Sequence, residues 1–336
     1  MKLSFEKIKE IATGVARVEH DGEGVRFCRF TEAQEALYKR TSADFYAKSF
    51  ATAGVRLSFV TDSKTLVLRG EATDGSSRLY YSVDVFVNGS PCGYIDNFSH
   101  IDMPADYAHI QLPIGKFGGE MSLGEGDKEV EIYLPWSVSM RLDELSLDDG
   151  AYVSALKREK TFLVFGDSIT QGYDALRPSN RYMSRLCNAL GASEINKSIG
   201  GELFFKELAR ERDDIEPDCI IVAYGSNNWS KGTREGMRDN CRGFFCALRE
   251  NYPTTKIFAL TPIWRKDIVE YRVFGDFCDV DPEIREAVKG LDVTVIDGFD
   301  FVPKEEKYFA DLRLHPNDEG FEFYFNNLLS ALKGNI

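Results

Sequence analysis

At the middle of the chain stands the segment Thr161-Phe162-Leu163-Val164-Phe165-Gly166-Asp167-Ser168-Ile169-Thr170. Its first five residues are apolar or β-branched, which predicts a buried strand. Gly166 and Asp167 then favour a turn before a helical pattern begins. A serine placed where a strand ends is exposed at the rim of the sheet, and it can attack a substrate if a base accepts its proton. Ser168 is therefore a candidate nucleophile, although a serine that merely caps a turn would look the same in isolation.

Three other polar blocks accompany this segment along the chain. They are Asn196 to Gly201, then Gly225-Ser226-Asn227-Asn228, and finally Asp311-Leu312-Arg313-Leu314-His315. His315 is a candidate general base because an imidazole titrates near neutral pH and can accept the serine proton. The remaining histidines lie outside the blocks in the first half of the chain, and we expect them at the surface or at an interface: His20, His100 and His109.

Taken together and in this order, the four blocks resemble those of the SGNH (GDSL-type) hydrolase family of serine esterases. The resemblance extends over the C-terminal half of the chain. It implies a flavodoxin-like α/β/α domain, an acyl-serine intermediate and no metal or other cofactor. It also implies an oxyanion hole made of the backbone N–H groups of Ser168 and Gly201 and the side-chain amide of Asn227.

The sequence departs from the family pattern in two places. The third block ends in Asn227-Asn228 where the family has Asn-Asp, and we expect a mild effect because the last position is generally structural. The family places an aspartate three residues before the histidine, but here that residue is Leu312, and Asp311 stands four before. Either a local bulge brings Asp311 to His315, or a backbone carbonyl holds the ring in a Ser-His dyad. We favour Asp311.

The hydrophobic pattern divides the chain into two domains, residues 1–155 and 156–336. In the first, short alternating or apolar runs are separated by turn signals, which predicts an antiparallel, jelly-roll-like β-sandwich. Asn88-Gly89 predicts a tight hairpin. The expected strands are 56–60, 65–69, 80–87, 129–134 and 141–147, and the expected helices are the first dozen residues and 33–38.

In the second domain, apolar strand segments alternate with longer helical patterns, which predicts a mostly parallel sheet with helices on both faces. The expected strands are 161–165, 194–198, 219–224, 256–261 and 293–297, and the expected helices are 181–190, 203–212, 233–251, 282–289 and 318–333. Active sites of such sheets lie at the carboxyl ends of strands. Ser168, Gly201, Asn227 and Trp264 each follow a predicted strand, and the linker is expected within 148–159.

The composition limits the class of partner. The chain has 336 residues with 54 acidic and 41 basic side chains, a net charge of −13. This balance disfavours nucleic acid or an anionic membrane as a partner, but it is compatible with a local basic pocket. Seven scattered cysteines without a Cys-x-x-Cys pair, and no apolar segment like a signal peptide or membrane helix, predict reduced thiols and a cytoplasmic location. The pattern does not predict an oligomeric state.

The family resemblance implies an ester substrate, such as an acylglycerol, an acyl thioester or an acetylated sugar. A β-sandwich before such a domain further resembles the layout of carbohydrate acetylesterases, so we expect short-chain, above all acetyl, esters of a carbohydrate or another small molecule. Trp229 and Trp264 are candidate contacts for a sugar ring or acyl chain, and Arg265 for an acidic substrate. Ordinary packing of the tryptophans and a solvated arginine are the alternatives.

Two other classes of function stay open. The first is a carbohydrate-binding protein with a decayed esterase domain, which the displaced aspartate supports. The second is a metal-dependent phosphoesterase that uses Asp167, Asp297 and Asp311, although these residues lack metal-ligand spacing with histidine or cysteine. A dinucleotide enzyme is disfavoured because no Gly-x-Gly-x-x-Gly follows a predicted strand.

Overall fold

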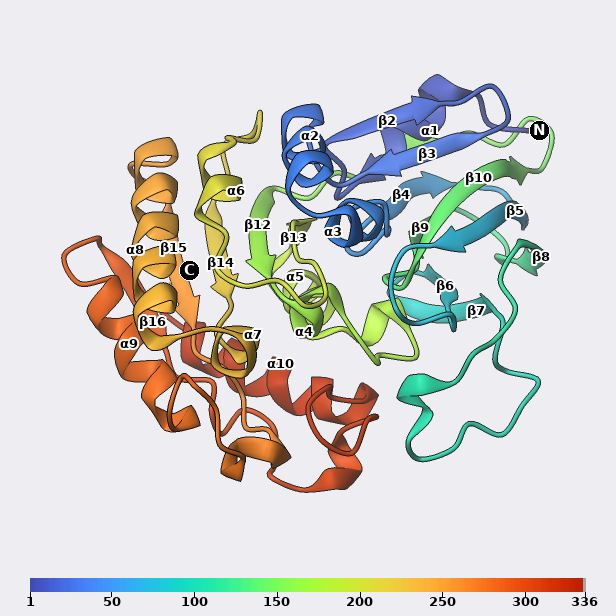
Figure 1. Ribbon diagram of the computed structural model, residues 1–336. Helices are drawn as coiled ribbons and strands as arrows, with labels where there is room; N and C mark the ends of the chain where they lie inside the picture. Colours follow the sequence, from blue (N-terminus) through green and yellow to red (C-terminus); the bar gives the residue numbers. More distant parts are fainter. Residues whose placement is uncertain (335–336) are drawn as a thin grey trace.

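The computed structural model describes residues 1–334, which form three β-sheets (Figure 1). Two antiparallel sheets come from the first half of the chain, coloured blue to green, and a five-stranded parallel sheet comes from the second half. This change from antiparallel to parallel pairing confirms the predicted fold class.

The strands pair in a defined order within each sheet. The first sheet has the order β1-β4-β9-β6-β7, with β11 also paired to β4; the second has the order β2-β3-β10-β5-β8; and the third has the order β13-β12-β14-β15-β16. The first sheet contains β1 (Ala12–Thr13), β4 (Arg56–Thr61), β9 (Lys128–Tyr133), β6 (Ser82–Val87), β7 (Ser90–Asp96) and β11 (Ser154–Ala155). The second contains β2 (Arg17–His20), β3 (Val25–Cys28), β10 (Val138–Leu147), β5 (Thr65–Asp74) and β8 (Lys116–Ser122). The third contains β13 (Ala192–Asn196), β12 (Lys160–Gly166), β14 (Cys219–Ala223), β15 (Lys256–Leu260) and β16 (Val293–Ile296).

The helices are distributed over both halves. Those of the first half are α1 (Phe5–Ile11), α2 (Glu32–Thr41) and α3 (Ala43–Lys48). Those of the second half are α4 (Ser168–Gln171), α5 (Tyr182–Leu190), α6 (Lys206–Arg210), α7 (Ser226–Lys231), α8 (Arg234–Asn251), α9 (Val280–Ala287) and α10 (Asp318–Leu332). Short 3-10 turns are η1 (Tyr107–His109), η2 (Pro178–Asn180), η3 (Lys266–Val269), η4 (Phe277–Asp279) and η5 (Glu306–Tyr308). None of these helices has the length and apolar character that crossing a bilayer requires.

The two antiparallel sheets share one apolar core. Side chains of β4, β6 and β9 meet side chains of β5 and β10 in this core, and they include Leu57, Val85, Ile132, Leu68 and Leu142. The predicted hairpin is present, because Asn88 and Gly89 have positive φ values of 50° and 76° and join β6 to β7.

The parallel sheet is apolar on both faces, and β12 shows why. Its side chains alternate between two cores: Phe162 and Val164 enter one, and Leu163 and Phe165 enter the other. The first core includes buried side chains of α5 and α10, and the second includes those of α8 and α9. The sheet is therefore covered on both faces, as the near-continuous apolar run predicted.

The first half of the chain also packs against the second half. Arg29 is fully buried and donates hydrogen bonds to the carbonyl oxygens of Ala51 at 2.5 Å, Asn196 at 2.8 Å and Ser198 at 3.0 Å. In return, Lys197 Nζ donates to the carbonyl oxygen of Arg29 at 2.6 Å. These bonds hold the segment after β13, which contains the second polar block, against the first half.

Some elements differ from the sequence prediction. Six strands of the first half had not been expected: β1, β2, β3, β7, β8 and β11. In β8 the pair Gly118-Gly119 interrupts the sequence pattern from which a strand is predicted, because glycine has low strand propensity. Strand β13 begins two residues earlier than expected, and the expected linker contains β11, which pairs with β4.

Candidate active site

Ser168 is the first residue of α4, and Asp167 alone separates it from the carboxyl end of β12. Asp167 caps the helix, because its carboxylate accepts a hydrogen bond from the N–H of Ile169 at 3.1 Å. Burial raises the pKa of Asp167 to about 6. A Cβ at Gly166 would lie 2.5 Å from Thr170 Oγ1 and 2.9 Å from the carbonyl oxygen of Ala223, so only glycine fits the tight strand-to-helix turn.

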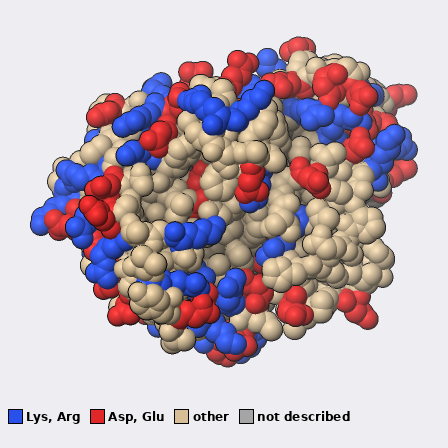
Figure 2. Space-filling view, viewed as in Figure 1, with Lys and Arg blue, Asp and Glu red and all other residues tan. Residues whose placement is uncertain are grey.

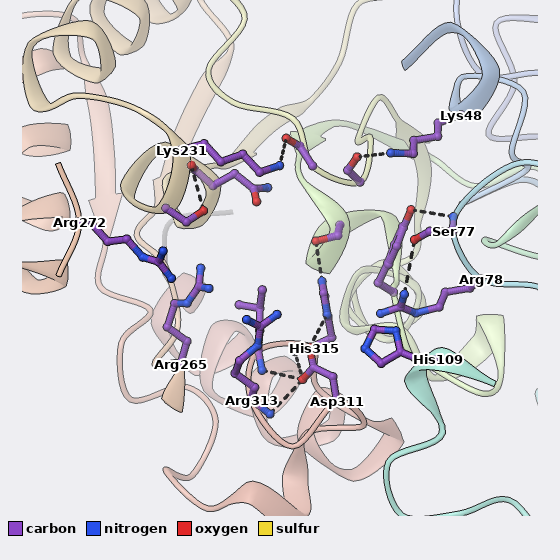
Figure 3. A pocket seen from close by; sticks show the side chains of 17 residues that line it. Lys48, Ser77, Arg78, His109, Lys231, Arg265, Arg272, Asp311, Arg313 and His315 are labelled. Carbon is purple, nitrogen blue, oxygen red and sulfur yellow. Dashed lines mark hydrogen bonds and ion pairs between the residues drawn. The ribbon is translucent and has the colours of Figure 1, made fainter. Parts of the chain in front are cut away.

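His315 joins Ser168 to Asp311 in an unbroken chain of hydrogen bonds (Figure 3). The Nε2 atom of His315 lies 2.8 Å from Ser168 Oγ, and its Nδ1 atom lies 2.8 Å from Asp311 Oδ2. This is the arrangement of a serine nucleophile, a general base and an orienting acid. The structure thus brings Ser168 together with the pair Asp311 and His315, from which it is far apart in the sequence.

A turn accommodates the unusual spacing of Asp311 and His315. Leu312 adopts a left-handed conformation with φ of 52°, which wraps the backbone around the carboxylate. The Oδ1 atom of Asp311 accepts hydrogen bonds from the N–H groups of Arg313 at 3.0 Å, Leu314 at 2.6 Å and His315 at 3.0 Å. Of the two arrangements left open by the sequence, the structure places Asp311, and not a carbonyl oxygen, against the imidazole.

These contacts keep Asp311 ionised. Burial alone would raise its pKa, but the hydrogen bond and charge of His315, together with the N–H groups of Leu314 and His315, outweigh burial and hold the pKa well below its usual range. An ionised acid at Nδ1 favours the tautomer with a proton on Nδ1, which leaves Nε2 free to accept the proton of Ser168.

A second carboxylate, Asp174, also faces the imidazole, and sequence reasoning missed it. Its Oδ2 atom lies 3.5 Å from Nδ1 of His315, and its backbone is left-handed with φ of 73°. The carboxylate is fully buried and accepts hydrogen bonds from Arg78 Nε at 2.7 Å and Tyr80 OH at 2.5 Å. The first half of the chain therefore contributes directly to the surroundings of His315.

The predicted oxyanion donors all line one cavity: Ser168, Gly201 and Asn227. Within residues 1–334, neither the backbone N–H of Ser168 nor that of Gly201 has a hydrogen-bond partner. Gly201 has a φ of 92°, a conformation that favours glycine. Asn227 Nδ2 donates to the carbonyl oxygen of Glu202 at 3.1 Å, which fixes the amide at the cavity wall. Unpaired N–H donors at a cavity wall can stabilise the negative charge that develops on a substrate oxygen.

Glu202 is a buried acid directly behind these donors, and no sequence signal had indicated it. Its two carboxylate oxygens accept hydrogen bonds from Tyr38 OH and Tyr224 OH, both at 2.7 Å. Burial raises the pKa of Glu202 to about 8, although the two tyrosine hydrogen bonds lower it. Because Tyr38 belongs to α2, this contact also ties the first half of the chain to the second polar block.

Glu202 should make the protein less stable as the pH rises from 5 to 8. The unfolded chain releases this proton near pH 4.5, whereas the folded chain retains it up to about pH 8. The stabilising contribution is therefore complete below pH 4.5 and is lost as the pH rises toward 8. Each unit of pKa corresponds to about 1.4 kcal/mol, so the loss between pH 5 and pH 8 should reach about 3 kcal/mol.

Urea denaturation of the wild type and of Glu202→Gln at pH 5 and pH 8 measures this effect. The variant should be less sensitive to pH, because a neutral amide replaces the titrating acid, whereas Glu250→Gln, at an exposed site, should behave like the wild type. An equal pH dependence in the wild type and Glu202→Gln would show that Glu202 is already ionised at neutral pH.

The cavity in front of Ser168 has a volume of about 450 Å³ and opens on the face shown in Figure 2. Arg265, the residue for which the sequence predicted a substrate contact, lines the cavity. His109 also lines it and is exposed, in agreement with the predicted surface position. Trp229 does not line it. That side chain is fully buried, and its indole N–H donates to the carbonyl oxygen of Gly275 at 2.9 Å.

Trp264 also lies outside the cavity wall and packs against Phe309, with a ring-centre distance of 5.5 Å. For both tryptophans the structure thus corrects the predicted substrate contact. The aromatic surface is used for packing, because helix α7 turns Trp229 toward Phe277 and the loop after β15 turns Trp264 toward the core around α10.

Comparison with known proteins agrees with this geometry. Residues 164–323 match the model of the GDSL-like lipase/acylhydrolase family. Residues 164–323 are a GDSL-like acylhydrolase domain. These residues contain all four polar blocks. A search of curated protein sequences gave no match.

Solved structures resemble the whole chain, and not the acylhydrolase domain alone. The salicylyl-acyltransferase SsfX3 from a tetracycline biosynthetic pathway has a TM-score of 0.78 at 21% identity, over 96% of this chain and 94% of that chain. A protein assigned as a GDSL-like lipase from Bacteroides ovatus has a TM-score of 0.78 at 20% identity, over 99% and 97%. The acetyl xylan esterase Est2A from Butyrivibrio proteoclasticus has a TM-score of 0.64 at 15% identity, over 100% and 98%. The fold, antiparallel sheets included, therefore recurs in these proteins.

Proposed function

We propose that the protein is a serine esterase that hydrolyses short-chain acyl esters, acetyl esters of carbohydrates in particular, through an acyl-serine intermediate. One observation carries the proposal. The hydrogen-bonded chain of Ser168, His315 and Asp311 opens into a cavity whose wall also holds unpaired N–H donors.

In the first half of the reaction, Nε2 of His315 accepts the proton of Ser168 as Oγ attacks the ester carbonyl carbon. The negative charge that develops on the carbonyl oxygen is stabilised by the N–H groups of Ser168 and Gly201 and the amide of Asn227. His315 then returns the proton to the departing alcohol. In the second half, His315 removes a proton from water as the water oxygen attacks the acyl carbon. The bond between that carbon and Oγ then breaks, the carboxylic acid leaves, and His315 returns the proton to Oγ of Ser168. Asp311 orients the imidazole and stabilises its protonated form.

The chemistry of the cavity wall supports a short acyl group. Leu314 is the one aliphatic side chain longer than alanine among the described lining residues, and most of the others are polar or charged. A long acyl chain would bury little apolar surface here, at about 25 cal/mol per Å² of apolar area. The likeness of the whole fold to an acetyl xylan esterase supports a carbohydrate as the alcohol part.

The metal-dependent alternative receives little support from the arrangement of acids. Within residues 1–334, the one group of acidic and histidine side chains close enough to share a cation consists of Asp174, Asp311 and His315. Arg78 already pairs with Asp174, and Asp311 is held by backbone N–H groups. Of the acids that the sequence suggested, Asp167 caps α4, and Asp297 accepts from the N–H of Phe299.

The proposal is tested by a panel of acetyl, butyryl and octanoyl p-nitrophenyl esters alongside acetylated xylo-oligosaccharides, with and without a chelator. We expect the highest kcat/KM for acetyl esters and no effect of the chelator. A fluorophosphonate probe should label the peptide that contains Ser168, as mass spectrometry would show. Absence of both hydrolysis and labelling would overturn the proposal, and glycan binding without hydrolysis would favour a carbohydrate-binding protein.

A further inference from the structure

The cavity in front of Ser168 is basic, although the chain as a whole is acidic. The acidic side chains outnumber the basic ones by 54 to 41 in the sequence. In the cavity wall the balance is reversed. Among the described residues that line it, Asp311 is the sole acid, and the basic residues are Lys48, Arg78, Lys231, Arg265, Arg272 and Arg313. Figure 3 shows these basic side chains on every side of the cavity, and Figure 2 shows blue groups around the hollow.

Three of the arginines share one buried carboxylate, that of Asp267. Arg265 binds it with two hydrogen bonds of 2.5 and 2.8 Å, Arg313 Nη1 lies 3.4 Å from it, and Arg272 Nη2 lies 3.7 Å from it. Arg272 has a second partner, Glu270, but its Nε is buried without a hydrogen-bond partner. This arginine cluster therefore has more positive than negative charge, and Arg313 remains half-exposed at the cavity.

Two lysines lie beside the candidate oxyanion donors. Lys48 Nζ donates to the carbonyl oxygen of Gly200, and Lys231 Nζ donates to that of Gly201, both at 3.2 Å. Lys48 pairs with Asp44, a largely exposed acid, whereas Lys231 has no ion-pair partner within residues 1–334. Burial, followed by the charge of Lys48, lowers the pKa of Lys231. The charged form of a partly buried lysine without an ion-pair partner is stabilised when an anion binds beside it in the cavity.

We propose that the ester substrate carries an anionic group, a carboxylate in the first place, that binds among the arginine cluster and the lysine pair. This inference rests on the proposed esterase function and specifies its substrate. A carboxylate matches the planar fork of a guanidinium group, which can bind both of its oxygens. An excess of like charge in a partly closed cleft also attracts an oppositely charged substrate and raises its rate of association.

The charge on the substrate is tested with matched pairs of esters at low ionic strength and at about 0.5 M salt, where charges are screened within about 4 Å. One pair places a carboxylate on the acyl part, monoethyl succinate against ethyl butyrate. A second places it on the alcohol part, acetylated methyl glucuronoside against acetylated methyl glucoside. An acetylated glucose phosphate tests a phosphate at the same site. We expect at least one carboxylate ester to exceed its neutral partner in kcat/KM by about 10-fold at low salt and much less at high salt.

Arg313→Gln tests the arginine cluster, because this half-exposed side chain can be shortened with little effect on packing. It should reduce the preference for the carboxylate ester by about 5-fold. Lys231→Gln is the second variant and should act in the same direction. Arg238→Gln is the matched control, since it removes the same charge from a half-exposed arginine that pairs with Glu283 outside the cavity. It should leave the preference unchanged.

The outcomes separate this inference from the proposed function. Equal kcat/KM values within every pair at both salt concentrations, with hydrolysis intact, would overturn the anionic substrate and leave the esterase. A preference for the phosphate ester over both carboxylate esters would replace the carboxylate by a phosphate and so contradict the proposal in its stated form. Absence of hydrolysis of every ester would overturn both proposals.

Discussion

Replacing Ser168 by alanine should lower kcat/KM for a short-chain ester by about 10,000-fold or more. The alanine keeps the backbone N–H of the proposed oxyanion hole, but it removes the oxygen that we propose as the nucleophile. The remaining rate would come from water activated by His315 and from binding alone. Hydrolysis of p-nitrophenyl acetate, corrected for the reaction in buffer, provides the measurement.

A matched control for this experiment is Ser330→Ala, on α10, where the hydroxyl donates only to the carbonyl oxygen of Asn326. This variant should retain wild-type activity, and both variants should keep the wild-type melting temperature. A Ser168→Ala enzyme within about 10-fold of the wild-type rate would mean that another group is the nucleophile and would remove the basis of the proposed mechanism.

Replacing Asp311 by asparagine should lower kcat by about 1,000- to 10,000-fold. The amide oxygen can take the place of Oδ1 and continue to accept hydrogen bonds from the three N–H groups of the turn, so the fold should survive. The amide nitrogen then faces Nδ1 of His315 as a donor. The imidazole responds by placing its proton on Nε2, where it can no longer accept the proton of Ser168.

Asp174 should not compensate for this loss. Its carboxylate is already engaged by Arg78 and Tyr80, and it lies farther from Nδ1, at 3.5 Å against 2.8 Å for Asp311. The matched control is Asp297→Asn, at an acid that follows β16 outside the cavity. Nearly unchanged turnover in Asp311→Asn would show that Asp174 or the backbone can orient the imidazole.

The sequence predicted the fold class and the central residues of the candidate site because both depend on local signals. The apolar run of β12 and the turn after it locate Ser168 at a strand end, and the four blocks supply the other polar groups in order. The spacing of Asp311 left two arrangements open, since a left-handed Leu312 is not visible in the sequence.

The basic side chains from the first half of the chain could not be predicted in the same way. Lys48 and Arg78 belong to segments with no motif, and they reach the cavity only because α3 and the loop after β5 pack against the second half. The predicted substrate contacts of Trp229 and Trp264 were wrong for a related reason. A sequence shows that an aromatic residue follows a strand, but whether it points to solvent or to the core depends on the neighbouring helix.

Arg29 has a consequence for protein engineering. Because its guanidinium group is enclosed between carbonyl oxygens of both halves, the acylhydrolase domain and the preceding sheets cannot be exchanged freely with those of a distant homologue. A chimera that lacks an arginine at this position would leave the carbonyl groups of Asn196 and Ser198 without this donor, so both sides of the contact would have to be transferred together.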